Sequence, residues 1–357
     1  MIRKKYKFVN ISVLVFVICI GGMLIVKKTQ VADEVSRSLA VCGEVLIPSI
    51  FPFMMLSSFA IKSGVFGSIN RISAPFMKKI FGLPAECFSC LFFGFIGGYP
   101  VGASIVSELY EKKKITEKDA RHIFSFCVNA GPAFVVTAAG EMMLRSETAG
   151  VVMLVSVCFA SVITGVVFSL FKRKTDYERI ITSEKNNLSQ ALVDSAFASS
   201  KGIISVCTWV LIFSAFSGLM QSFIKNETLL LVYLAFSEVT TGIGSAAKLG
   251  GIPLVSAVIS FGGICVMCQI LPIIKKCGVK ASEYLAFRIV NAVLSFFTAK
   301  IILLFIDVPI NVFADTEMHL WSHTAPSSAI LLIMCAVLIF DITSGQIKKL
   351  KIYDITG

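Results

Sequence analysis

The residue of this sequence best suited to chemistry is a carboxylate in a predominantly apolar run. Glu238 lies within the run from 229 to 247 and is followed closely by two threonines. Ionisable residues inside apolar membrane segments are costly and usually mark a ligand or ion pathway. We predict that the carboxylate binds a coupling cation or proton, or accepts a hydrogen bond from a ligand; the alternative is an ion pair with Arg288 or Lys300 that only fixes helix packing. The contacts predicted on this stretch are Glu238, Thr240, Thr241 and Gly242.

A second candidate is the glycine- and proline-rich stretch at 93–103, Phe-Gly-Phe-Ile-Gly-Gly-Tyr-Pro-Val-Gly-Ala. Its apolar arms are shorter than the ~20 residues that a spanning helix needs. We predict a re-entrant hairpin over 84–110, because irregular backbone at membrane depth is tolerated only where protein or a cavity surrounds it. The helix that begins near Val101 would direct its N-terminus at an anion; the alternative is that the glycines only permit close helix packing. The predicted contacts are Gly97, Gly98, Tyr99, Pro100 and Gly102.

Two spans that we expect to face these hairpins are interrupted as well. Asn129 precedes Gly131 and Pro132, and a proline inside a helix frees the carbonyl about four residues earlier. Gln269 lies in a second span, which Ser-Phe-Gly-Gly interrupts at 260–263. We predict that these positions contact a polar ligand; a proline kink satisfied by a neighbouring helix is the alternative. The predicted contacts are Asn129, Gly131, Pro132 and Gln269.

A basic residue, Arg288, lies in a later apolar span, three residues before Asn291. Residues three apart on a helix share a face, and a buried guanidinium suits a carboxylate ligand. We therefore predict that Arg288 contacts an anionic substrate, with a place near the inner membrane interface as the alternative. Lys300, further along the same span, is expected to extend outward to the interface.

Motifs for catalysis or metal binding are absent from the sequence or weak. It holds no Gly-x-x-x-x-Gly-Lys-Ser/Thr, Gly-x-Ser-x-Gly or His-Glu-x-x-His pattern. His319 and His323 have a spacing that could hold a metal, but we interpret 307–326 as a solvated outer loop. Apolar burial favours neutral thiols in the two Cys-x-x-Cys pairs, Cys87 with Cys90 and Cys265 with Cys268. We predict no enzyme activity, no metal and no cofactor, apart from a coupling cation or proton.

The composition is that of a protein embedded in a membrane. Of the 357 residues, 56% are hydrophobic and only 15% are charged, and the mean hydropathy is +0.83. Soluble domains carry roughly 25% charged residues, so a soluble enzyme is excluded. The net charge of +11 belongs to basic loops that orient membrane spans, and it does not indicate nucleic acid as a partner.

Apolar segments and basic loops together give the predicted topology. If both hairpins return to the side from which they enter, most of the 33 Lys and Arg residues fall on one side. That side is the cytoplasm, which places both termini there and the chain in a cell membrane. We predict five regions: an N-terminal span in 1–34, a first repeat over 35–171, a polar linker at 172–190, a second repeat over 191–280 with a hairpin at 229–249, and two spans in 281–357.

The two halves share a pattern of opposite orientation. Each has a span, then a hairpin, then a broken span, and the predicted hairpins enter from opposite sides. Inverted repeats whose broken helices meet near the membrane midplane are typical of secondary transporters. The predicted fold class is an all-α polytopic membrane protein, an inverted-topology repeat with two re-entrant hairpins and broken helices.

Four short motifs resemble a known family. Ile-Pro-Ser-Ile-Phe-Pro-Phe at 47–53, Gly-Tyr-Pro-Val-Gly-Ala at 98–103 and Phe-Cys-Val-Asn-Ala-Gly-Pro-Ala-Phe at 126–134 resemble the sporulation integral membrane protein YlbJ (SpoVV) family. Glu-Val-Thr-Thr-Gly at 238–242 looks like the second-half motif of that family. The family carries the nucleoside recognition, or Gate, domain. The resemblance covers roughly residues 35–305.

This resemblance implies a fold similar to that of concentrative nucleoside transporters. It also implies a place in endospore formation, in the outer forespore membrane, and movement of dipicolinic acid toward the developing spore. The expected partners are a small-molecule substrate, the lipid bilayer, and a second copy of the chain or sporulation membrane proteins. Two alternatives remain open at this point: a transporter of nucleosides or other small metabolites, and a non-transporting scaffold for spore or envelope assembly.

Overall fold

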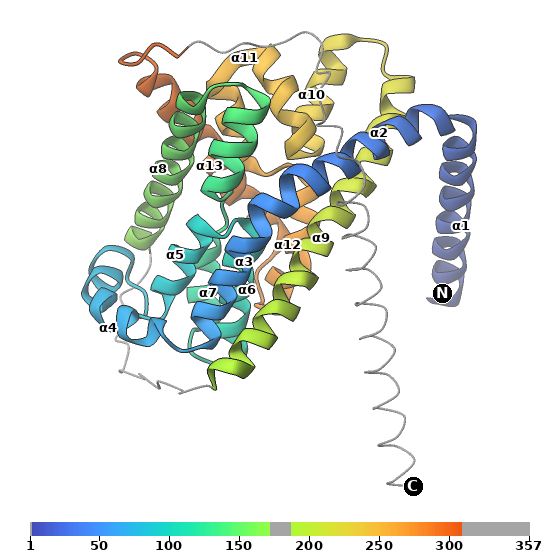
Figure 1. Cartoon of the computed structure of the whole chain (residues 1–357). Helices are drawn as coiled ribbons and strands as arrows, with labels where there is room; N and C mark the ends of the chain where they lie inside the picture. Colours follow the sequence, from blue (N-terminus) through green and yellow to red (C-terminus); the bar gives the residue numbers. More distant parts are fainter. Residues whose placement is uncertain (1, 172–186, 309–357) are drawn as a thin grey trace, which may run out of the picture.

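The computed structural model describes residues 2–171 and 187–308, and all regular structure within these ranges is helical (Figure 1). Helical stretches long and apolar enough to cross a membrane are Lys28–Lys62, Glu147–Leu170, Leu188–Phe223, Val239–Lys276 and Ala281–Ile302. The predicted class, an all-α multi-pass membrane protein, is therefore confirmed. The predicted span near the C-terminus, His319 and His323, and most of the linker and of the outer loop lie outside the described residues.

The helices follow one another in two groups, separated by the linker. The first group is α1 (Ile2–Val26), α2 (Lys28–Val41), η1 (Cys42–Leu46), α3 (Ile47–Lys62), α4 (Phe66–Phe76), η2 (Met77–Phe81), α5 (Cys87–Ile96), α6 (Tyr99–Glu111), α7 (Glu117–Phe124), η3 (Ala133–Met143) and α8 (Glu147–Phe171). The second group is α9 (Leu188–Phe223), α10 (Glu227–Ser237), α11 (Val239–Phe261), α12 (Gly263–Lys276) and α13 (Ala281–Ile302). The η elements are π-helical turns.

Helix α1 lies beside the rest of the bundle and contacts the end of α2. Helices α2 and α3 are joined by η1 into one long helical stretch, which packs along α9 (Figure 1). The predicted boundary between 34 and 35 therefore falls inside α2. Polar contacts join α2 to α9: Ser38 Oγ donates to Ser214 Oγ over 2.8 Å, and Gln221 Nε2 donates to Glu34 Oε1 over 2.9 Å. Lipid tails are as apolar as the helix surfaces, so the hydrophobic effect does not drive membrane helices together. Hydrogen bonds of this kind contribute to their association instead.

Helices α5 and α6 form the first helical hairpin, and they are separated at Gly97 and Gly98. Gly98 has φ +85°, a backbone conformation that favours glycine over any residue with a Cβ. Pro100 lies at the start of α6, where its missing N–H costs nothing. The glycine-proline tip is therefore set by local backbone preference.

Helices α10 and α11 form the second helical hairpin, and extended backbone at Glu238 separates them (φ −145°, ψ 138°). Asn226 caps α10 by accepting a hydrogen bond from the N–H of Leu229 over 2.9 Å. Helix α11 then bends at Gly250 and Gly251 and continues to Phe261. The second half thus reaches its interrupted span after a non-helical break of two glycines, whereas in the first half the loop after α6 and the short helix α7 lie between.

Two further helices are interrupted near these hairpin tips. Helix α7 ends at Phe124, residues 125–131 are non-helical, and η3 begins at Ala133 after the helical Pro132. Between α11 and α12, Gly262 takes φ +86° and ends the first helix. The first interruption lies between the α5–α6 hairpin and α8, where the rings of Phe81 and Phe126 stack with centroids 4.9 Å apart.

Candidate functional site

A cavity of about 60 Å³ lies where both hairpin tips meet both interrupted helices. Helices α3 and α9 close its remaining sides. Its lining residues come from six parts of the chain: Leu46, Ser49, Ile50 and Phe53; Ile96, Gly97, Gly98, Tyr99 and Pro100; Ala130, Gly131, Ala133 and Phe134; Val206 and Val210; Glu238, Val239 and Thr240; Cys265, Val266 and Gln269. One water molecule needs at least about 10–15 Å³, so the cavity has room for a few water molecules.

Glu238 is the charged residue of this lining, and it is 4% exposed. Its carboxylate caps α11: the N–H groups of Thr240 and Thr241 donate to it over 2.9 and 3.0 Å. The hydroxyl of Thr240 donates to it as well. These hydrogen bonds pair the first N–H groups of α11, which have no acceptor inside the helix. Within the described residues, the ion pair with Arg288 or Lys300 is not formed.

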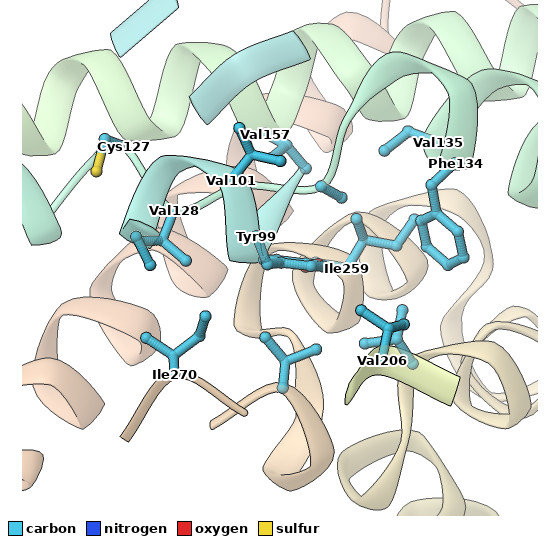
Figure 2. Packing of buried hydrophobic residues seen from close by; sticks show 14 of the residues in the cluster. Tyr99, Val101, Cys127, Val128, Phe134, Val135, Val157, Val206, Ile259 and Ile270 are labelled. Carbon is cyan, nitrogen blue, oxygen red and sulfur yellow. The ribbon is translucent and has the colours of Figure 1, made fainter. Parts of the chain in front are cut away.

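The tip of the first hairpin contributes Tyr99, which lies beside Ile259 (Figure 2). Its hydroxyl donates to the carbonyl of Ile259 on α11, so the tip of one hairpin is bonded to the interrupted helix of the other half. Gly131 lies against the same tip: a Cβ added there would meet the carbonyl oxygen of Ile96 at 2.6 Å. The absence of a side chain at Gly131 therefore permits the tip and the first interruption to touch.

Arg288, predicted as a substrate contact, does not line the cavity. Its guanidinium donates instead to the carbonyls of Val128, Ser260 and Phe261, the last over 3.1 Å from Nε. It also lies over the ring of Tyr99, with Cζ 5.6 Å from the ring centroid. Arg288 is thus separated from the cavity by Tyr99, and its charge acts on the backbone of both interruptions.

The side chain of Asn129 also points away from the cavity. Its Nδ2 donates to the carbonyl of Phe126 over 2.7 Å, and Ser161 Oγ of α8 donates to its Oδ1 over 2.7 Å. Asn291 serves the same loop, because its Nδ2 donates to the carbonyl of Ser125 over 2.8 Å. These amides replace the helical hydrogen bonds that the interruption removes.

The bond between Asn129 and Ser161 can be measured by a double-mutant cycle. We expect Asn129→Ala and Ser161→Ala each to lower the stability of the purified protein. The coupling between them should be about 0.6–2 kcal/mol, the range of interhelical hydrogen bonds in membrane proteins. Thermal unfolding in detergent of the two single variants, the double variant and the parent gives the coupling. Strictly additive effects would contradict this hydrogen bond.

Eight of the predicted contacts line the cavity and six do not. Those that line it are Gly97, Gly98, Tyr99, Pro100, Gly131, Glu238, Thr240 and Gln269. Those that lie outside the lining are Gly102, Asn129, Pro132, Thr241, Gly242 and Arg288. Thr241 still donates to the Glu238 carboxylate, and Gly242 packs closely on α10, where an added Cβ would lie 2.9 Å from the carbonyl oxygen of Ala235.

The side walls of the cavity were not predicted from the sequence. Ser49, Ile50 and Phe53 come from α3, and Val206 and Val210 come from α9. The two prolines at 48 and 52 were a usable signal for the first wall, because they interrupt an otherwise regular apolar span. The valines of α9 carry no such signal, since they resemble every other apolar residue of a membrane helix.

Metal-binding side chains do not gather in the described part of the chain. No group of three or more His, Cys, Asp or Glu residues there has metal-binding geometry. The four residues of the Cys-x-x-Cys pairs are not joined by disulfides. Cys265 lines the cavity, where Gln269 Nε2 donates to its sulfur over 3.6 Å.

Comparison with known proteins finds similarity to a domain family and to a sporulation membrane protein. Residues 44–174 match the family model described as nucleoside recognition (Gate), and this range includes the first hairpin and the first interruption. The chain is 21% identical over 313 residues to the sporulation integral membrane protein YlbJ of Bacillus subtilis (strain 168). That alignment covers 75% of this chain and 77% of the relative. The resemblance seen in the sequence motifs is thereby confirmed. No solved structure matches the chain.

Proposed function

We propose that this protein is a transporter-like membrane protein of endospore formation that moves a small polar metabolite across a membrane. One observation carries the proposal: both hairpin tips and both interrupted helices line a single cavity that contains a buried carboxylate. Interrupted helices near membrane depth are tolerated where they line a cavity, and they are the usual binding sites of secondary transporters. Similarity to a sporulation membrane protein supports the cellular role.

The proposed architecture is an inverted-topology repeat similar to concentrative nucleoside transporters. In support, each half has a hairpin followed by an interrupted helix: α5–α6 with α7 and η3, then α10–α11 with α12. The second hairpin lies near the upper end of the molecule, and α4 and α7 lie near the lower end (Figure 1). Two such halves of opposite orientation would open one central site to either side in turn.

The specific substrate that we propose is an anionic metabolite, and the resemblance to the YlbJ family indicates dipicolinic acid. The lining sets a condition on this substrate, because it contains the carboxylate of Glu238 and, among the residues that the structure describes, no basic side chain. Two like charges in a buried site repel strongly. An anion would therefore enter together with a proton or a cation that neutralises Glu238, aided by the N-terminus of α6 at the cavity.

A neutral metabolite such as a nucleoside is the second candidate. The same lining favours it, since Ser49, Thr240 and Gln269 supply hydrogen-bonding groups and Glu238 accepts hydrogen bonds from a hydroxyl or an amine. The description of the matched family model, nucleoside recognition, supports this candidate as well. A non-transporting scaffold is the alternative from a different functional class. It predicts that substitutions in the cavity are tolerated.

A ligand screen on the purified full-length protein tests these proposals. We expect dipicolinate, nucleosides or dicarboxylates to raise the Tm, and a ligand present at 100 times its Kd stabilises by ~2.7 kcal/mol. Uptake of the same compound into proteoliposomes should follow, and for dipicolinate it should depend on an inward proton or cation gradient. If none of the three classes raises the Tm or is taken up, the scaffold alternative is favoured and the transport proposal fails.

A further inference from the structure

Arg288 is buried without a carboxylate partner among the described residues. It is 1% exposed, and its donors go to backbone carbonyls. A buried charge is costly unless it is fully hydrogen-bonded. Because the guanidinium of Arg288 is buried and does not line the cavity, its role is structural.

The carbonyls that Arg288 contacts belong to the two interruptions. Val128 lies in the non-helical segment 125–131 after α7, and Ser260 and Phe261 are the last residues of α11. Carbonyls at the end of a helix have no intrahelical donor, and they form the negative end of the helix dipole. Arg288 supplies the missing donors and the opposite charge at once.

The guanidinium geometry lets one side chain serve both segments. Nη1 donates to Val128, whereas Nη2 and Nε donate to Ser260 and Phe261. A lysine ammonium is a compact charge without this planar set of donors. The ring of Tyr99 lies against the guanidinium and bonds Ile259, so the first hairpin tip joins the same network.

Other polar residues on the same face of α13 do not bridge the two interruptions. Asn291 donates to the carbonyl of Ser125 in the first interruption. Ser295 Oγ donates to the carbonyl of Ser256 on α11 over 3.2 Å. Asn291 and Ser295 therefore serve as controls. Like Arg288 they lie on α13 and donate to backbone carbonyls, but neither of them reaches both interruptions.

We propose that Arg288 is a positioning residue that ties the two helix interruptions together and thereby fixes their geometry at the cavity. It acts through backbone carbonyls and Tyr99, and it does not bind the substrate. The proposal goes beyond the proposed function and holds for a transporter or a scaffold. Its residue lies outside the part of the chain, 44–174, that matches the family model.

Hydrogen–deuterium exchange of the full-length protein in detergent or nanodiscs tests this role. We expect Arg288→Met to accelerate exchange by about tenfold or more in peptides covering 123–135 and 256–267 together, because a hydrogen bond to a charged group is lost at each segment. Peptides from the α2–α9 contact should keep the exchange rate of the parent protein. Asn291→Ala should affect only the first peptide, and Ser295→Ala only the second.

Three results would overturn the proposal: acceleration at one interruption only, no acceleration at either, or an equal increase at the α2–α9 contact. If Arg288→Met does not yield folded protein, Arg288→Lys replaces it. The lysine variant keeps the charge but loses the planar donors. Exchange at both interruptions should therefore be faster than in the parent protein, and slower than in Arg288→Met if that variant can be purified. Parent-like exchange of Arg288→Lys at both sites would equally contradict the role.

Discussion

Glu238→Gln is expected to lower uptake of the transported metabolite by about a hundredfold, the equivalent of ~2.7 kcal/mol, while the amount of folded protein changes by less than about twofold. The side-chain amide has one acceptor oxygen in place of two. It would therefore leave Thr240 or Thr241 facing an NH₂ group, and it would remove the charge that the cavity presents. Proteoliposome uptake and size-exclusion chromatography of the purified variant measure the two effects separately.

Two further variants separate the charge of Glu238 from its capping role. Glu238→Asp keeps a carboxylate, and aspartate is among the preferred helix caps, so its Tm should remain near that of the parent protein. Its shorter side chain withdraws the charge from the cavity, so uptake should still fall, though less than in Glu238→Gln. Glu227→Gln, at the exposed start of α10 in the same hairpin, is the control and should leave uptake unchanged. Unchanged uptake in Glu238→Gln would remove Glu238 from the proposed mechanism.

Gly102→Ala is expected to lower the Tm by about 2–10 °C, because overpacking costs roughly 1–3 kcal/mol and each kcal/mol shifts the Tm of a large domain by ~2–4 °C. An added Cβ would lie 2.9 Å from Gly94 Cα and closer still to the carbonyl oxygen of Cys127. Both neighbours are backbone atoms, so no side chain can move aside. Thermal unfolding followed by size-exclusion chromatography measures this shift.

Gly244→Ala is the matched control for the glycine prediction. Gly244 lies in α11, is exposed, and has no atom within 4 Å of an added Cβ. Alanine is favoured over glycine inside a helix by up to ~1 kcal/mol, so this variant should keep or raise the Tm. Equal Tm values for the two variants would contradict the tight packing of the first hairpin on segment 125–131.

These expectations give Gly102 a role different from the one that the sequence predicts. The sequence places it in a ligand site, with close helix packing as the alternative. In the structure Gly102 lies outside the cavity lining and against the Cys127 carbonyl, which favours packing. Gly97 and Gly98, five and four residues earlier, line the cavity. Glycines that look alike in the sequence are thus divided between packing and the cavity by their neighbours.

The sequence by itself determined the membrane class and the places where helices are interrupted. High apolar content and few charges require a lipid environment, and the glycines and prolines at 97–102, 129–132 and 262–263 impose their backbone preferences locally. It also singled out Glu238, because a carboxylate within an apolar run is costly wherever the run packs. The inverted pairing of the halves and the orientation of the termini stay predictions.

The tertiary structure alone decided where the polar side chains point and which helices close the cavity. Arg288 and Asn129 looked like ligand contacts, but nearby carbonyls with no helical donor take their hydrogen bonds. The walls from α3 and α9 were not predictable, because helices that are apolar on every face give no periodic signal of which face is buried. Interruptions arise from local backbone chemistry, whereas the partners of a buried donor depend on which segments the fold brings beside it.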